Sequence, residues 1–505
     1  MDMSILAESF KNLCTVQGFV FVVLGSLAGV LLGAIPGLGS STLLVVLLPL
    51  AYKMEPAMCM ALFISVVIGG MSGGCIGSIL LGIPGTSSSL CTVWDGYEFT
   101  KQGNPVRALS AAVTANFLGT VPSLILAIFA VKYLARWAVT LGPWEYAGLC
   151  FMAVLMVVGL SKGNVVKSMI GVGLAIFLSS IGTDPINATG RFVLFGNLNF
   201  LKGLNLISVM LGLFAAKIIM LEYARHEKQN NQITVKVDGY KIPLKDFIEN
   251  KWCFIRSWIT GVLIGFLPGL GGPVAAVMAY SNEKTLDKKN KEKWGHGHIA
   301  GVISCETANN AGIGGALIPL IALGIPGDAA CVQFISALNV KGIQVGPLLI
   351  QEHPEIVYMI FIGAILSGIV VLLYETLGMK TFPSLLKIPY HYLYSMVIIL
   401  ALTGAYMSTN NLFGLYVALG SCILGVIMDV LEIPSLPFLM TFILSPMLEE
   451  NLRKGFSYAE NGWVQFFTRP ISLACIIIGI GVLVYGIISP MLERKKAAKN
   501  AAQAN

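Results

Sequence analysis

The sequence predicts an all-α polytopic membrane protein, with about 10–12 transmembrane helices arranged in two homologous halves. Of its 505 residues, 56% are hydrophobic and only 12% are charged, and the mean hydropathy is +0.79. Soluble proteins contain about 25% charged residues, so the composition is not that of a soluble domain. Uncharged apolar runs of spanning length support the same conclusion; examples are residues 106–130 apart from Arg107, the shorter run 147–160, 356–374 and 471–489.

Other compositional features further define the class of membrane protein. The 55 glycines exceed the usual share of about 7%, which predicts closely packed membrane helices. The ten cysteines are scattered without metal or disulfide spacing, and we interpret them as small apolar residues. No basic region precedes the first apolar run, so we expect no removable signal peptide. The net charge of +7 lies mostly in loops and near helix ends, a pattern typical of membrane topology rather than nucleic-acid binding.

A helix-breaking motif interrupts the first apolar region. It reads Gly33-Ala-Ile-Pro-Gly-Leu-Gly39, and a near copy, Gly265-Phe-Leu-Pro-Gly-Leu-Gly271, follows 232 positions later (265 − 33). Proline removes a backbone donor and glycine admits conformations that other residues avoid, so a helix must unwind at each copy. Within a bilayer, such a break is tolerated only inside protein or beside a wet cavity. Both copies are therefore candidate ion or substrate sites.

A second break shows that the chain is duplicated. Gly82-Ile-Pro-Gly85 recurs as Gly324-Ile-Pro-Gly327, at an offset of 242 (324 − 82). A weaker echo pairs Pro143-Trp-Glu-Tyr146 with Pro389-Tyr-His-Tyr392. Landmarks in one order at slowly growing offsets indicate a repeated unit. The predicted division is a first membrane repeat at 1–221, a basic cytoplasmic linker at 222–256, a second membrane repeat at 257–490 and a basic C-terminal tail at 491–505.

The charges leave the relative orientation of the two repeats open. The charged insertion at 282–293 has a nearly uncharged counterpart at 52–55, as inverted repeats would predict. The basic tail, in contrast, places the C-terminus on the same side as the linker, which implies an even number of spans per half and parallel repeats.

With these motifs assembled, the chain resembles the large integral membrane subunit of the tripartite tricarboxylate transporter family (TctA-like). The resemblance covers almost the whole length. It depends on the paired Pro-Gly segments at 33–39 and 265–272, the paired Gly-Ile-Pro-Gly motifs and the stretch Trp94-Asp-Gly-Tyr97.

The resemblance implies a multi-pass permease of the bacterial inner membrane, and not an enzyme. Such a permease works with a small integral membrane subunit and a periplasmic solute-binding protein. The binding protein delivers a carboxylate, often citrate, and a sodium or proton gradient drives symport into the cell. The residues themselves leave two alternatives, a standalone carrier or channel for organic anions and a membrane-embedded enzyme. The sequence contains no HExxH, GxSxG or Walker motif, which disfavours the enzyme.

The breaks are the predicted substrate site. The N-terminus of a half-helix attracts an anion through its free N–H groups and dipole, and nearby hydroxyls add donors. We expect carboxylates to bind at Pro36, Gly37, Gly39, Ser40, Ser41, Thr42, Gly85, Thr86, Ser87 and Ser88, with Pro268, Gly269, Gly271 and Gly272 from the second half. The second half lacks the hydroxyls, so the two copies are not expected to bind the same group. Alternatively, each hydroxyl satisfies a helix carbonyl or packs at a crossing.

The predicted cation-coupling residues lie in the second half: Glu306, Asn309, Asn310, Pro326, Gly327 and Asp328. Amide, carboxylate and carbonyl oxygens suit sodium, whereas a protonatable Glu306 or Asp328 suits proton coupling. No other metal and no cofactor is expected. Glu306 lies close to a charged loop, so the alternative is a solvated side chain.

Two further polar segments are interpreted as loops. Asp95, Glu98 and Arg107 are assigned to a solvated interfacial loop. Gly295-His-Gly-His298 has the look of a metal-binding dyad, but a third ligand is missing nearby.

Overall fold

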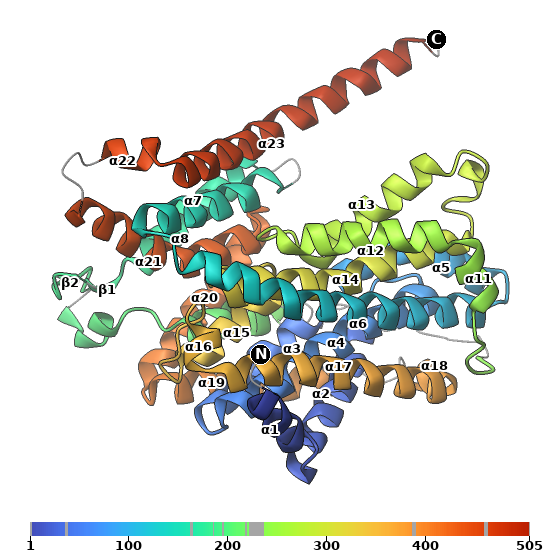
Figure 1. Cartoon of the computed structure of the whole chain (residues 1–505), viewed down its shortest axis with the longest axis horizontal. Coiled ribbons are helices and arrows are strands. Elements are labelled where there is room, and N and C mark those ends of the chain that lie inside the picture. The colour runs from blue at the N-terminus through green and yellow to red at the C-terminus, as the bar shows by residue number, and fades with distance from the viewer. Residues whose placement is uncertain are drawn as a thin grey trace. The chain divides into compact units, whose positions relative to one another are not determined.

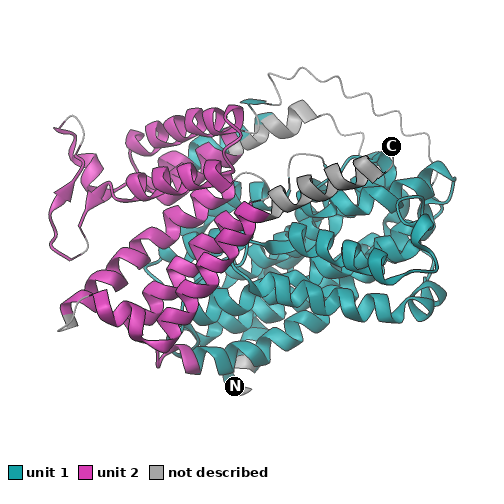
Figure 2. Ribbon diagram, turned by 90° about the horizontal axis from the view of Figure 1, so that it is seen from above, with its two compact units in different colours: residues 1–136, 218–404 teal, residues 137–217, 405–505 magenta. Residues whose placement is uncertain are grey.

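The computed structural model describes residues 3–503 apart from 36–38, 162–164, 185, 194–195, 218–219, 222–236, 386–389 and 459–462. The chain divides into two compact units, shown in Figure 2, of residues 1–136 with 218–404 and residues 137–217 with 405–505. Each unit takes chain from both predicted repeats. The repeat boundaries, which concern duplication rather than compactness, stay predictions.

The regular elements of the first unit are all helices among its described residues (Figure 1). Its helices are α1 (Met3–Leu13), α2 (Val16–Ala34), α3 (Ser40–Leu47), α4 (Pro56–Leu81), α5 (Leu90–Lys101), α11 (Leu244–Glu249), α12 (Lys251–Phe266), α13 (Gly271–Leu286), α14 (Ile299–Leu323), α15 (Ala329–Asn339), α16 (Leu349–Glu352), α17 (Pro354–Leu377) and α18 (Phe382–Leu385). Two more helices, α6 (Pro105–Ala138) and α19 (Tyr390–Thr409), have residues in both units.

Two central helices form the core of the first unit. Every residue of α14 is buried, as is nearly all of α4. Each packs along the helix that comes before the first break of its own repeat, α4 against α2 and α14 against α12. Such packing on all sides explains why most positions around both helices are apolar or small, with Glu306, Asn309 and Asn310 of α14 among the exceptions.

The duplication is visible in how these helix pairs cross. A Cβ built on Gly33 would collide with the carbonyl oxygen of Gly70, and a Cβ on Gly265 would collide with that of Gly312. Gly70 and Gly312 are 242 positions apart, the offset of the second break. The two halves therefore use equivalent glycines at equivalent crossings, where only a hydrogen atom fits between the backbones.

Each repeat also lends one helix to the core of the other. From the first repeat, α6 packs on α14, where a Cβ at Gly119 would lie 2.7 Å from the carbonyl oxygen of Thr307. From the second repeat, α17 packs on α4 and also on α2, where the hydroxyls of Ser367 and Ser26 are 2.7 Å apart. The indole of Trp258 donates to the Gly119 carbonyl oxygen at 3.2 Å. Because Trp258 stands at the position of Ser26 in its repeat, Gly119 corresponds to Ser367.

The second unit contains α7 (Pro143–Gly159), α8 (Val165–Ser179), α9 (Leu206–Met210), α20 (Leu412–Val430), α21 (Ser435–Tyr458), α22 (Trp463–Thr468) and α23 (Pro470–Gln503). Strands β1 (Gly182–Thr183) and β2 (Gly190–Arg191) form a short antiparallel pair. Beside them, Arg191 and Arg453 both bond Asp184. The Asn187 N–H, then the Ile186 N–H and these two arginines, hold the Asp184 pKa below its ordinary value against the opposing effect of burial. The cluster fixes a loop outside the apolar helices.

The architecture confirms an all-α polytopic membrane protein. Among the described residues, six helices are long and apolar enough to cross a membrane, namely α2, α4, α6, α17, α20 and the apolar part of α23. Shorter apolar helices include α7, α8 and α15. The predicted runs at 106–130, 147–160, 356–374 and 471–489 fall within α6, α7, α17 and α23, apart from one residue at the end of α7. The total number of spans and the repeat orientation stay predictions.

Candidate functional site

The first break of each repeat lies between two helices, as predicted. Helix α2 ends at Ala34 and α3 begins at Ser40, while α12 ends at Phe266 and α13 begins at Gly271. Pro36 and Gly37 lie outside the described residues. In the second copy, Gly269 and Gly271 have φ values of +77° and +58°, a region that favours glycine. The predicted unwinding at Pro268 is therefore present.

The second break of each repeat follows the central helix. Helices α4 and α14 end on left-handed glycines, Gly82 at φ +69° and Gly324 at φ +73°. In the first repeat, the Thr86 and Ser89 side chains then cap a short 3-10 turn, Ser87–Ser89, which leads into α5. In the second repeat, Asp328 caps α15 by accepting from the Cys331 N–H at 2.8 Å. The helix that follows the second break is thus capped by hydroxyl groups in the first repeat and by a carboxylate in the second.

Within each repeat, the two breaks touch. The Gly269 N–H donates to the Gly327 carbonyl oxygen at 2.8 Å. A Cβ on Gly271 would lie 3.0 Å from the Asp328 Cβ. In the first repeat, a Cβ on Gly39 would lie 3.4 Å from the Thr86 Cγ2 atom. The start of one half-helix therefore faces the start of another in both copies.

The breaks of the two repeats also approach each other. The Ser88 hydroxyl donates to the Met71 Sδ atom at 3.7 Å. The Met71 Cε atom would lie 3.4 Å from a Cβ on Gly272, and the Asn309 Oδ1 atom faces the same glycine. Thus Ser88 of the first repeat, Gly272 of the second and Asn309 of α14 gather around Met71. We call these residues, with Thr86, Gly271 and Asp328, the break cluster.

Asn309 is the most unusual member of the break cluster. It is fully buried, and both its Oδ1 and its Nδ2 atoms lack a hydrogen-bond partner among the described residues. Buried polar groups are nearly always paired, because an unmade hydrogen bond costs about 1–3 kcal/mol. The unpaired amide beside the helix breaks therefore makes Asn309 a candidate ligand-binding residue.

The sequence allows two roles for the hydroxyl groups near the breaks, binding a carboxylate or satisfying a backbone carbonyl. Thr86, Ser88 and Ser89 bond one another, with the Thr86 and Ser88 hydroxyls 2.9 Å apart. Ser40 and Thr42 are buried, Ser41 is half-buried and Ser87 is exposed. Ser89 donates to the Thr86 carbonyl oxygen, the local satisfaction that the alternative interpretation described. The remaining hydroxyls stay candidates for a carboxylate.

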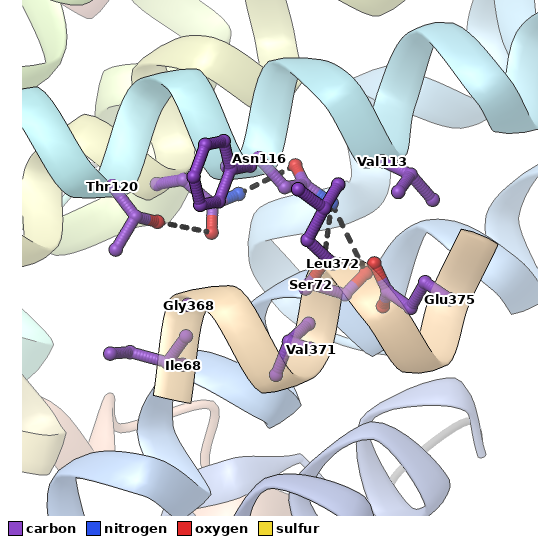
Figure 3. A pocket seen from close by; sticks show the side chains of 11 residues that line it. Ile68, Ser72, Val113, Asn116, Thr120, Gly368, Val371, Leu372 and Glu375 are labelled. Atoms are coloured by element: carbon purple, nitrogen blue, oxygen red, sulfur yellow. Dashed lines mark hydrogen bonds between the residues drawn. The ribbon is translucent and has the colours of Figure 1, made fainter. Parts of the chain in front are cut away.

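The predicted cation residues separate into two groups. Asn309 and Asp328 belong to the break cluster, with Pro326 and Gly327 immediately before Asp328. Glu306 and Asn310 belong instead to a buried polar network with Thr92, Ser72, Asn116, Thr120 and Glu375, part of which is shown in Figure 3. Glu306 is only 1% exposed, so the alternative of a solvated side chain is wrong.

This network, which we call the carboxylate network, contains residues that the sequence did not single out. Glu375 on α17 is fully buried, and its Oε2 atom accepts from the Ser72 hydroxyl at 2.7 Å. Asn116 on α6 donates to the same hydroxyl at 2.8 Å. One signal was present, because Glu375 directly follows the apolar run 356–374 and an ionisable group in a spanning helix is a functional candidate.

The prediction that Asp95 lies in a solvated loop is wrong. Residues 90–101 form α5, Arg107 lies in the first turn of α6, and the Asp95 side chain is completely buried. Its Oδ1 atom accepts from the Gly295, Gly297 and His298 N–H groups at 2.8–3.0 Å, and its Oδ2 atom accepts from the Tyr280 hydroxyl. The glycine-histidine segment is indeed a loop, and its backbone holds a carboxylate.

We expect Asp95→Ala to lower the stability of the purified protein by on the order of 3 kcal/mol, because three N–H groups and a phenol lose a charged acceptor. The measurement is a thermal melt in detergent. Glu98→Ala is the control, since Glu98 pairs with the exposed Lys101 and such surface pairs contribute little. Equal melting of both variants would show that the Asp95 contacts are unimportant.

Comparison with known proteins identifies the family. Residues 19–440 match the Tripartite tricarboxylate transporter TctA family. The chain belongs to this family. It is therefore the large subunit of a tripartite tricarboxylate transporter, a multi-pass membrane protein of a transporter family rather than an enzyme family.

Two relatives of this TctA-family chain come from Agrobacterium vitis. An uncharacterized 52.8 kDa protein in the TAR-I ttuC' 3'region is 30% identical over 499 residues, 98% of each chain. An uncharacterized protein in the TAR-II ttuC' 3'region is 32% identical over 236 residues, 47% of this chain and 97% of the relative. No solved structure matches the chain.

Proposed function

We propose that this chain is the permease of a solute-binding-protein-dependent importer of di- and tricarboxylates such as citrate, driven by a cation gradient. It acts in the bacterial inner membrane with a small membrane subunit and a periplasmic solute-binding protein. The observation that supports this proposal most strongly is the break cluster, where helix breaks of both repeats lie around the unpaired buried amide of Asn309.

The break cluster supports anion binding without a permanent positive charge. Helix α3 begins at Ser40, and the Ser87–Ser89 turn leads into α5. Free N–H groups and hydroxyls at these starts attract a carboxylate. Since such contacts are weaker than paired arginines, they allow the anion to leave on the other side of the membrane.

The second repeat supplies oxygen atoms for a coupling cation. Asn309 Oδ1 has no donor among the described residues, and Asp328 brings a carboxylate to the adjacent break. A cation between these oxygens compensates the charge of the bound carboxylate, which makes simultaneous binding favourable. We propose this charge compensation as the basis of symport.

Substitution of the first-repeat hydroxyls tests the substrate half of the proposal. We expect Ser41→Ala with Thr86→Ala to raise the KM for citrate about 100-fold or more, since two hydrogen bonds to a charged group contribute a net of about 1.5–3 kcal/mol each and about 1.4 kcal/mol is a factor of ten. Uptake is measured in proteoliposomes containing the complex and its binding protein. Thr140→Ala, on an exposed turn, is the control. Unchanged uptake at equal protein levels would remove these hydroxyls from the site.

Copurification separates this proposal from a standalone carrier. A tagged chain is expected to retain the small membrane subunit in detergent, and to take up citrate only when the binding protein is present. Uptake by the chain alone at the full rate would favour the standalone carrier.

A further inference from the structure

Two buried carboxyl groups of the carboxylate network have no cationic partner among the described residues. Glu306 on α14 is 1% exposed and Glu375 on α17 is 0% exposed. Glu306 Oε1 accepts from the Thr92 hydroxyl, and Glu375 Oε2 accepts from Ser72. Within the same described part of the chain, Glu375 Oε1 has no hydrogen-bond partner. An unpaired ionised carboxylate is costly to bury, so these groups require an explanation.

A continuous line of polar atoms joins the two carboxyl groups, part of which is visible in Figure 3. The Asn116 amide stands between them. Its Nδ2 atom lies 2.8 Å from the Ser72 hydroxyl, which in turn donates to Glu375. Its other terminal atom lies 2.8 Å from Glu306 Oε2 and 2.7 Å from the Asn310 Nδ2 atom. A change in the protonation of one carboxyl group therefore alters the hydrogen bonding of the other through the Asn116 and Ser72 side chains.

The donors in this line suffice for one ionised carboxylate, not two. With the Asn116 Nδ2 atom toward Ser72, the Ser72 hydroxyl serves Glu375, and the Asn116 oxygen faces Glu306 Oε2. That contact is a hydrogen bond only when Glu306 carries a proton. After a half-turn of the amide, Nδ2 serves Glu306, Ser72 donates to the Asn116 oxygen, and Glu375 loses its donor. The Asn310 amide must turn with it, because the Asn116 Nδ2 atom would otherwise face the Asn310 Nδ2 atom at 2.7 Å. Glu375 must then carry the proton and donate it to the Ser72 oxygen.

The fold itself does not require this network. Contacts shared by the two repeats relate α4 to α14 and α6 to α17, through Gly70 with Gly312 and through Gly119 with Ser367. At the related positions, the polar members are all replaced by apolar or small residues. Glu306, Asn310 and Ser72 correspond to Ile64, Ile68 and Gly314, and Glu375, Asn116 and Thr120 correspond to Ala127, Ala364 and Gly368. One packing arrangement thus exists with and without the polar groups, which points to a role other than packing.

We propose that Glu306 and Glu375 form a proton-binding site that holds one proton between them, with Asn116 and Ser72 turning according to which carboxyl group carries it. This inference rests on the proposed function, because it adds a proton, bound apart from the cation at Asn309 and Asp328, to the gradient that drives uptake. Because the donors support only one ionised carboxylate, the site gains and loses a second proton, and its charge alternates between −1 and 0 during a transport cycle.

Among the described residues, the surroundings supply no competing positive charge. The ionisable groups that lie close to the two carboxyl groups are thiols and a phenol, namely Cys75 of α4, Cys305 of α14 and Tyr374 of α17. Beyond them lie Cys91 and Asp95 of α5, Cys253 of α12 and Tyr280 of α13. Asp95 has its own four donors. A cavity of ≈ 10 Å³ beside Glu375 and Asn116 is about the size that one water needs.

Infrared spectroscopy of the purified protein tests the site without a transport substrate. The wild-type spectrum minus that of the Glu306→Gln/Glu375→Gln variant, recorded at neutral pH, is expected to contain one carboxylic-acid C=O band and one carboxylate band. A difference spectrum with carboxylate bands alone, or with acid bands alone, would overturn the shared proton. Glu355→Gln, an exposed position on the same helix as Glu375, is the control and should leave both bands in place.

A transport measurement connects the site to coupling. In proteoliposomes with the complex, labelled citrate accumulation driven by a pH gradient is expected in the wild type and in Glu355→Gln, and to be lost in Glu375→Gln. Persistent pH-driven accumulation in Glu375→Gln would contradict the inference. If the wild type takes up no citrate at all, the proposed function fails instead, and the infrared result still decides the proton site.

Discussion

Gly265→Val is expected to remove most of the folded protein from the membrane. Its Cβ would collide with the Gly312 carbonyl oxygen, so α12 and α14 could not cross at their present separation. Overpacking costs about 1–3 kcal/mol where side chains can yield. Here the obstacle is backbone, and the cost should exceed that range. Gly33→Val, at the related crossing with Gly70, should have the same effect.

The amount of monodisperse protein extracted from membranes measures this loss. Gly420→Val is the matched control, because nothing among the described residues lies within 4 Å of a Cβ at that glycine in α20. Similar yields of Gly265→Val and Gly420→Val would mean that the close crossing of the two helices is not required for folding.

Asn309→Leu is expected to abolish carboxylate transport while making the empty protein more stable. Leucine has nearly the same shape, so packing is preserved. It removes two buried polar atoms that lack partners in the described part of the chain, a deficit of about 1–3 kcal/mol. The opposite signs of the two effects distinguish a binding residue from a structural one, whose loss would lower stability and activity together.

A thermal melt and an uptake assay on the same preparation measure both effects. Thr441→Val is the control, because its buried hydroxyl on α21 also lacks a partner among the described residues. It should raise stability and leave uptake unchanged. Normal uptake by Asn309→Leu would exclude Asn309 from the transport site.

The helix breaks were predictable because their cause is local. Proline and glycine act on the backbone at the position where they occur, and left-handed Gly82, Gly269 and Gly324 are found within or beside the predicted breaks. The duplication was predictable for the same reason, since both copies retain these residues. That breaks of both repeats meet around Met71 was not evident, because sequence order does not show which helices exchange between repeats.

The errors involve interactions between distant parts of the chain. Asp95 lies in a polar segment that is typical of a loop, yet its partners Gly295 to His298 are about 200 positions away. In the sequence, Glu375 stands at the end of an apolar run, and only the structure shows that Ser72, about 300 positions away, donates to it. In both cases, the carboxylate is buried because tertiary packing supplies its hydrogen-bond donors. The local sequence pattern around the carboxylate does not predict those donors.

Transport by the complete complex tests the central claim most directly. The carboxylate retained by the purified binding protein is identified by mass spectrometry and then supplied, labelled, to proteoliposomes containing both membrane subunits. We expect accumulation above the outside concentration when an inward sodium or proton gradient is imposed with the binding protein present, and none with Asn309→Leu. No accumulation under either gradient, or equal accumulation by Asn309→Leu, would contradict the account.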